Sequence, residues 1–349
     1  MLHRTAVVVS ALALAAAVGC GGDDPDHLAA GDDFSVEAAL ADLPVPDGDE
    51  GLTVTVFDLE AAGEANDAGE RPGSDDDDVG GWFLTATGTA TEEGEDFPPV
   101  FVPPAEVLGT ERIASIEEIE SELGWSALDV DAVAEVLLPP FRFGVVAGDV
   151  GDDTFADAGL EADDGVVRIG EGEDGETDPA GATAARPLGT PLSMAAEDGR
   201  LAVGSSGDDV AAWLDGEPAT LAEEDDLRGV AAVLDEAGAV AAYLTTATPS
   251  SGSYTAVGIG WAVEDGEPRI TIAYAYEDEE AAEGAVDEVE AAYDATSAIT
   301  AAPIADQLAL DDVEVDGAVV VAHVRPGPEG RPQTPFAMLQ QRDVPFAFG

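Results

Sequence analysis

Three stretches of the sequence alternate between apolar residues and polar or small residues, and each is interrupted by an Asp-Gly pair. The pairs are Asp198-Gly199 in PLSMAAEDGRLAVGSS, Asp265-Gly266 in YTAVGIGWAVEDGEPRITIAYAY and Asp316-Gly317 in VEVDGAVVVAHV. Asp-Gly between apolar runs is a strong β-hairpin signal, because the central residues of the tight turn need positive φ angles. The pattern therefore predicts three hairpins in a largely antiparallel sheet.

The middle hairpin also predicts how its first strand packs. Large residues share one face of this strand, and small residues share the other: Val257, Ile259, Trp261 and Val263 against Ala256, Gly258, Gly260 and Ala262. Successive side chains of a strand point to opposite faces. We therefore expect the large face to lie in the core, and the small face to admit a helix or another backbone at close range.

Two segments carry apolar residues at helical spacing. One stripe is Ile113, Ile116, Ile119 and Leu123, and the other is Leu221, Leu227, Val230, Val233 and Leu234. Ser115 with Glu118, and Thr220 with Glu223, match the capping box that begins a helix. We expect two amphipathic helices packed on the sheet, the second ending near Gly238. A core face is typical of such stripes, and a binding face is the alternative for the isoleucine stripe.

The order of these elements suggests an internal repeat. FRFGVVAGDV, a short helical stretch and the Asp198-Gly199 hairpin follow the same order as PRITIAYAYED, the helix EEAAEGAVDEVEAAYDA and the Asp316-Gly317 hairpin. The sequence thus predicts an α+β fold, with antiparallel sheet packed against amphipathic helices and two related strand-helix-hairpin units. We expect an N-terminal α+β region at residues 34–140 and a C-terminal α+β region with the repeat at 141–349, with one continuous domain as the alternative.

The N-terminus has the layout of a secretory signal peptide over residues 1–19. Arg4 precedes the uncharged run TAVVVSALALAAAV, which is too short to span a membrane. Ala17-Val18-Gly19-Cys20 then resembles the lipobox of bacterial lipoproteins, and this resemblance implies that Cys20 carries a diacylglyceryl anchor. Cleavage after Ala15-Ala16-Ala17 is the alternative, and it would release a soluble protein.

The residues after the lipobox fit the same class of protein. Cys20 is the single cysteine, so a fold held by disulfides is excluded. Residues 20–33 are polar, acidic and small, and we expect them to form a disordered tether. The body of the chain resembles uncharacterised secreted lipoproteins of GC-rich Gram-positive bacteria. This resemblance implies a protein at the extracytoplasmic face of the cell membrane.

The charge limits the possible partners. The chain has 75 acidic and 12 basic residues, for a net charge of -63, and it has no lysine. A nucleic acid needs a basic footprint that is absent here, so nucleic acid is excluded as a partner. Anionic lipid would be repelled as well, so we expect membrane contact through the lipid anchor only. The acidic surface indicates adaptation to high salt, with codon bias as another explanation for the missing lysine.

Candidate chemistry is sparse. The histidines are His3 in the signal peptide, His27 in the predicted tether and His323 on a predicted strand, where a structural role is typical. GSSG at 204–207 is not a nucleophile elbow, and its Ser206 is expected to cap a helix. Acidic loops at 75–80, 149–159 and 170–178 offer oxygen ligands for calcium without the EF-hand order. We therefore assign no catalytic, cofactor or metal residue, and Cys20 is the one assigned site.

These features favour a membrane-anchored lipoprotein that acts as a non-catalytic binding or interaction module for an unknown protein or small molecule. One alternative is a carboxylate- or calcium-dependent hydrolase of an envelope polymer, which requires facing carboxylates in a cleft. Another is a carrier of an apolar ligand, which requires a cavity lined by the helix stripes and the face of Trp261.

Overall fold

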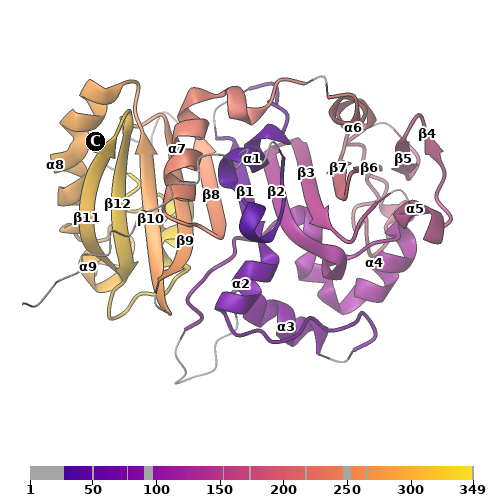
Figure 1. Cartoon of the computed structure of the whole chain (residues 1–349), viewed down its shortest axis with the longest axis horizontal. Helices are drawn as coiled ribbons and strands as arrows, with labels where there is room; N and C mark the ends of the chain where they lie inside the picture. The colour runs from indigo at the N-terminus through magenta and orange to yellow at the C-terminus, as the bar shows by residue number, and fades with distance from the viewer. Residues whose placement is uncertain are drawn as a thin grey trace, which may run out of the picture.

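A computed structural model describes residues 27–48, 51–76, 78–89, 97–151, 153–172, 174–216, 218–246, 253–264 and 266–347. Its centre is a 12-stranded sheet in the order β11-β12-β10-β9-β8-β1-β2-β3-β7-β6-β5-β4, and every neighbouring pair is antiparallel (Figure 1). The predicted α+β class with a largely antiparallel sheet is confirmed. The strands are β1 (Thr53–Asp58), β2 (Val130–Leu138), β3 (Phe141–Gly148), β4 (Ala162–Asp163), β5 (Val166–Ile169), β6 (Leu192–Glu197), β7 (Arg200–Gly204), β8 (Ala241–Thr246), β9 (Ala256–Glu264), β10 (Glu267–Ala275), β11 (Leu308–Asp316) and β12 (Val319–Pro326).

The sheet consists of two halves with the same strand order. The first half runs β1-β2-β3-β7-β6 and the second runs β8-β9-β10-β12-β11, and the antiparallel pair β1–β8 joins them. The short strands β4 and β5 extend the first half at its edge. The boundary predicted at residues 140 and 141 falls in the turn between β2 and β3, inside one hairpin. The change from one half to the other lies between β7 and β8 instead.

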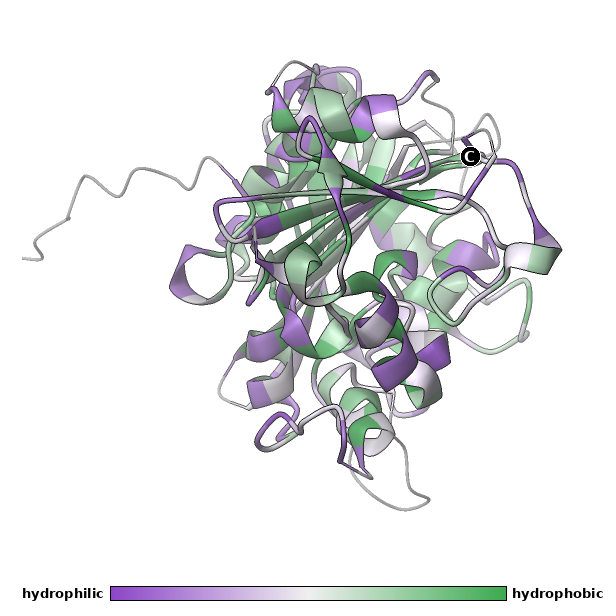
Figure 2. Cartoon of the chain, turned by 90° about the vertical axis from the view of Figure 1, so that its right-hand side faces the viewer, coloured by the Kyte–Doolittle hydropathy of each residue, from purple (hydrophilic) through white to green (hydrophobic). Residues whose placement is uncertain are grey.

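Helices cover both faces of the sheet, which Figure 2 shows between two helical layers. One face packs against α1 (Val36–Ala41), α6 (Gly207–Leu214) and α7 (Asp225–Glu236). The other face packs against α2 (Leu59–Ala65), α3 (Val79–Ala86), α4 (Ile116–Leu123), α5 (Thr154–Asp157), α8 (Glu279–Tyr293), α9 (Ile304–Gln307) and α10 (Thr334–Gln340). The two faces carry separate apolar cores, because successive residues of each strand alternate between them.

The small face of β9 contacts a helix at close range, as its glycines predicted. A Cβ atom at Gly260 would lie 2.9 Å from Leu234 Cδ2, and one at Gly258 would overlap Val230 Cγ1. Both partners belong to α7. The large residues of the same strand, with Trp261 among them, lie in the core on the opposite face. The alternation of large and small residues therefore predicted both sides of this strand correctly.

Two of the predicted hairpin turns differ in where the Asp-Gly pair lies relative to the turn. Glu197 pairs with Arg200, so Asp198 and Gly199 form the turn between β6 and β7, and their φ angles are 50° and 76°. Between β11 and β12, Asp316 pairs with Val319, so the turn residues are Gly317 and Ala318. The turn therefore lies one residue later than predicted. Gly317 has a φ of 55° at the first turn position, which is the position that needs glycine in a type II′ turn. In the middle hairpin, Asp265 lies outside the described residues.

The predicted capping boxes are wrong, although both helices are present. Ser115 ends a 3₁₀ helix (Thr110–Ser115) and makes no capping hydrogen bond to α4. Thr220 bridges Pro44 in a short antiparallel contact that holds it extended, and α7 begins only at Asp225. Ser206, by contrast, accepts a hydrogen bond of 3.3 Å from Asp209 N and caps α6 as predicted.

The described residues begin inside the predicted tether, at residue 27. Leu28 is buried, and its N–H donates to Asp42 Oδ2 over 2.7 Å. A 3₁₀ helix (Gly31–Asp33) follows. Residues 27–33 are therefore part of the fold, because Leu28 supplies the apolar contact that a tether lacks. The predicted signal peptide, Cys20 and the tether up to residue 26 lie outside the described residues.

Candidate functional site

A cavity of about 360 Å³ lies on the face of the first half that carries α4. Its lining comes from β3, β6, β7, α4 and the segments on either side of α4, together with the chain from residue 185 to 192. The residues are Glu106, Val107, Leu108, Arg112, Ile119, Leu123, Trp125, Ser126, Ala127, Arg142, Ala185, Arg186, Pro187, Leu188, Thr190, Leu192 and Val203. Ligand sites in proteins commonly have volumes of roughly 300 to 1,000 Å³.

The floor of the cavity is apolar. Leu192 on β6 and Val203 on β7 face the cavity from the sheet, and Ile119 and Leu123 face it from α4. Trp125 is buried beside them, and its Nε1 donates to Met194 Sδ over 3.5 Å. The isoleucine stripe therefore packs in the core, as such stripes typically do, and two of its residues, Ile119 and Leu123, also line this cavity.

Three of the chain's 12 basic residues, all arginines, line this one cavity. Arg112 Nη1 donates to the carbonyls of Ala184 and Ala185 over 2.6 and 2.8 Å. Arg186 Nε donates to Glu122 Oε1 on α4 over 3.1 Å. These two arginines therefore hold the loop around Ala185 against the rest of the cavity wall.

Arg142, on β3, is more exposed than Arg186. Its Nη1 pairs with Glu106 Oε2 over 3.3 Å, and the two side chains are 33% and 63% exposed. Arg186, in comparison, is 11% exposed. Arg142 is therefore held in the cavity lining by one long ion pair that is partly exposed to solvent.

The charge of the lining distinguishes this cavity from two others in the described part of the chain. Its charged residues are three arginines and one glutamate. A second cavity is lined by Glu70, Arg71, Asp76 and Asp78, and a third by Asp32, Asp33, Glu37, Asp58 and Asp235. In a chain with a net charge of -63, only the first of these three cavities has a positive lining.

Glu135 positions the wall of the cavity from beneath. This fully buried residue of β2 accepts hydrogen bonds of 2.8 Å from the N–H groups of both Glu106 and Val107. Burial raises the pKa of its carboxyl to about 7, while those N–H groups and Arg142 lower it. Sequence reasoning missed Glu135, and the signal was available, because a glutamate interrupts the apolar strand VDAVAEVLL.

The predicted candidates lie elsewhere. His323 is on β12, where its Nε2 lies 3.2 Å from Glu314 Oε1 and its Nδ1 lies 3.4 Å from Thr271 Oγ1. Within the described residues, no three His, Cys, Asp or Glu side chains are grouped as a metal site would require. Cys20 and parts of the acidic loops lie outside those residues.

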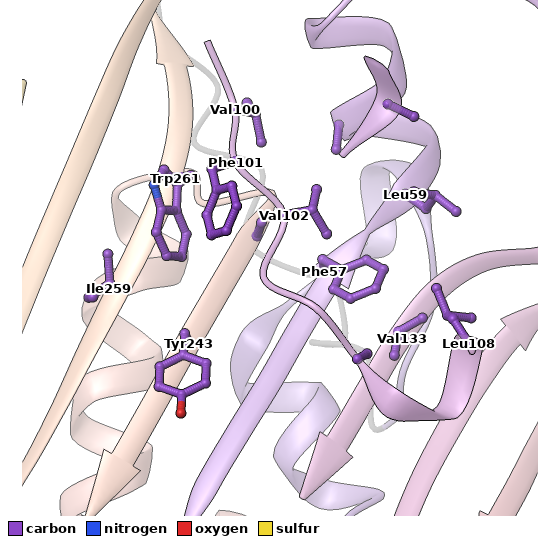
Figure 3. Packing of buried hydrophobic residues seen from close by; sticks show 14 of the residues in the cluster. Phe57, Leu59, Val100, Phe101, Val102, Leu108, Val133, Tyr243, Ile259 and Trp261 are labelled. Atoms are coloured by element: carbon purple, nitrogen blue, oxygen red, sulfur yellow. The ribbon is translucent and has the colours of Figure 1, made fainter. Parts of the chain in front are cut away.

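Trp261, whose face the apolar-carrier alternative places in a cavity wall, lies in none of the three cavities described above. Trp261 is fully buried, and its Nε1 donates to the carbonyl of Pro332 over 2.7 Å. Its ring packs edge-on against Phe101 at a centroid distance of 5.5 Å (Figure 3). The segment 97–105, which links α3 to α4, therefore fills the space above Trp261.

Comparison with protein-family models, with curated proteins and with solved structures finds no match for this chain. In the part of the chain that the structure describes, none of the helices has the length and hydrophobicity that a membrane crossing requires.

Proposed function

We propose that this protein is a membrane-anchored, extracytoplasmic binding protein that holds a small molecule in the cavity beside α4 and performs no catalysis on it. The observation that carries the proposal is the lining itself, which combines a majority of apolar side chains with three arginines and one glutamate. This combination is typical of ligand sites, in which apolar surface provides affinity and a few polar groups provide orientation.

The carboxylates around the cavity support binding over hydrolysis. Glu106 pairs with Arg142, and Glu122 accepts hydrogen bonds from Arg186 and Thr183. Both oxygens of Glu135 accept backbone N–H groups. A glycoside hydrolase needs two carboxyl groups that face the substrate as acid and base or nucleophile. Glu122 and Glu135 instead have structural partners, which leaves Glu106 as the one carboxylate of the lining itself.

The test uses the uncharged fluorescent probe N-phenylnaphthylamine, with energy transfer from tryptophan as the signal. We expect saturable binding that Ala185→Trp abolishes, because Ala185 lines the cavity and a large side chain there would fill it. Ala281→Trp is the matched control, since Ala281 is exposed on α8 in the other half. Equal binding by the wild-type protein and Ala185→Trp would contradict the proposal.

The anchor rests on the lipobox-like sequence that ends at Cys20. Two or three acyl chains at this residue would hold the protein stably at the membrane surface. Mass spectrometry of the native N-terminus is the direct measurement. A mature chain that begins at Val18 with an unmodified thiol would contradict lipidation.

Adaptation to high salt is the remaining part of the proposal. The charges of an excess of 63 acidic residues repel one another in dilute buffer, and the Debye length falls from about 10 Å at 0.1 M salt to about 3 Å at 1 M. We expect the melting temperature to rise steeply between about 0.05 and 2 M sodium chloride, a range that spans these screening regimes. An unchanged midpoint would contradict it.

A further inference from the structure

We infer that the ligand is an apolar molecule that carries one anionic group, a carboxylate or a phosphate, and that Arg142 binds this group at the mouth of the cavity. The inference rests on the proposed binding function and specifies its ligand class. It also assigns a polarity to the site, with the anion at Arg142 and the apolar body over Leu192 and Val203.

The sign of the ligand follows from the contrast between the cavity and the whole molecule. A net charge of -63 attracts cations to almost any part of the surface, so cation binding needs no special site. An anion is repelled everywhere except where arginines are concentrated. The chain has few basic residues, and this cavity contains three of them beside a single glutamate. Such a lining favours an anionic guest.

Arg142 is the binding group because the other two arginines hold the wall. Arg112 bonds to two backbone carbonyls and Arg186 to Glu122, and breaking these bonds would release the loop around Ala185. The Arg142–Glu106 pair is exposed, and exposed ion pairs contribute little net free energy. A ligand carboxylate can therefore displace Glu106 and accept the planar guanidinium fork in two parallel hydrogen bonds.

The apolar residues on the floor of the cavity indicate that the rest of the ligand is apolar. Ile119, Leu123, Trp125, Leu192 and Val203 offer hydrocarbon and an indole, and Arg142 belongs to the same lining with its side chain 33% exposed. An inorganic anion would leave this floor in contact with water. Burial of an apolar body on the floor, in combination with one charge at Arg142, satisfies both parts of the lining.

The test compares two probes of nearly equal shape, anilinonaphthalene sulfonate and the uncharged N-phenylnaphthylamine, on the full chain in high salt. We expect the sulfonate to bind at least about tenfold more tightly, as one charge-assisted contact would provide. Arg142→Gln should remove that preference and leave the affinity for the uncharged probe within about twofold. Arg228→Gln is the matched control, because Arg228 forms an exposed ion pair on α7 with Asp225.

A second variant covers the case in which Arg142→Gln fails to fold. Glu106→Gln keeps the backbone N–H that Glu135 accepts and removes the carboxylate that competes for Arg142, so it should tighten sulfonate binding. Equal affinity for the two probes, or sulfonate binding that neither variant changes, would overturn the anionic ligand and leave the binding function intact. No binding of either probe by the folded protein would overturn both.

Discussion

The two halves of the sheet have the same strand order and differ in what covers one face of the terminal hairpin. In the second half, α8 lies across β11 and β12 and closes the core (Figure 1). In the first half, the link between β3 and β6 contains the four-residue α5, and the cavity opens over β6 and β7. Among the described residues, the same framework therefore carries a helix over this hairpin in the second half and a cavity in the first.

The composition of the two links explains this difference. The segment that forms α8, EEAAEGAVDEVEAAY, is rich in alanine and glutamate, which favour helices. The link in the first half includes the turn sequence DDGVV at 163–167 and the run ETDPAGATAARPLGTP at 176–191, whose glycines and prolines disfavour helix. A helix covers the hairpin only where the link can form one.

A single strand position shows how the first half accommodates its cavity wall. Thr55, the third residue of β1, pairs with Glu135, and Tyr243, the third residue of β8, pairs with Ile259. Glu135 therefore occupies the position that a buried isoleucine holds in the second half. Its neighbour Gly144 leaves room for Val107, since a Cβ there would lie 3.1 Å from Val107 Cβ. Glutamate and glycine together hold the wall segment.

The largest expected effect comes from a matched pair of tryptophan substitutions, one in each half. Trp261→Ala should lower the free energy of unfolding by about 3 to 5 kcal/mol, because it opens a void in the closed core and leaves the Pro332 carbonyl without its donor. Trp125→Ala should cost roughly half as much, because one side of its ring already borders the cavity. Urea denaturation in high salt measures both, and equal losses would contradict the contrast between closed and hollow halves.

The next effect is a pH dependence that belongs to Glu135. Its carboxyl has a pKa of about 7 in the folded protein and an ordinary value of 4.5, so the folded state binds the proton more tightly. Stability from this group is present below about pH 4.5 and is lost as the pH rises through 7, by about 3 kcal/mol in all. Glu135→Gln removes this titration. As the pH rises through this window, the wild type should therefore lose about that amount of unfolding free energy relative to the variant. Parallel pH profiles of the two proteins would contradict the assignment.

The fold could be predicted from the sequence where local signals were strong. The cavity could not be predicted. Alternation in β9 predicted its packed and its narrow face, because large and small residues separate cleanly there. The capping boxes failed because contacts distant in sequence, such as the Thr220–Pro44 bridge, fixed the local backbone. The cavity joins Arg112, Arg142 and Arg186 from three separate segments, and no local pattern brings these residues together.

A smaller difference in stability is expected on the sheet face that packs against α7. Gly258 on β9 holds the position that Ala134 holds on β2, since their partners Leu244 and Val56 are the fourth residues of β8 and β1. Gly258→Ala should destabilise the protein by about 1 to 3 kcal/mol, because the new methyl group would collide with Val230. Gly284→Ala, in an open position on α8, should instead stabilise it by about 1 kcal/mol. Thermal melts of the two variants should shift in opposite directions, and shifts of the same sign would contradict the close approach of α7.

The smallest effect is expected at His323, whose position on a strand predicts a structural role. Its ring is 38% exposed and contacts the 60% exposed Glu314, so the pair is solvated and screened. Glutamine can reach the same partners, and substitutions at such sites commonly change the free energy of unfolding by no more than about 0.5 kcal/mol. For His323→Gln we therefore expect a melting shift below about 2 °C and unchanged binding of both fluorescent probes, because the residue is absent from the cavity lining. A loss of probe binding without a loss of stability would place a functional group in the closed half. That result would contradict the proposal that the binding site lies in the first half alone.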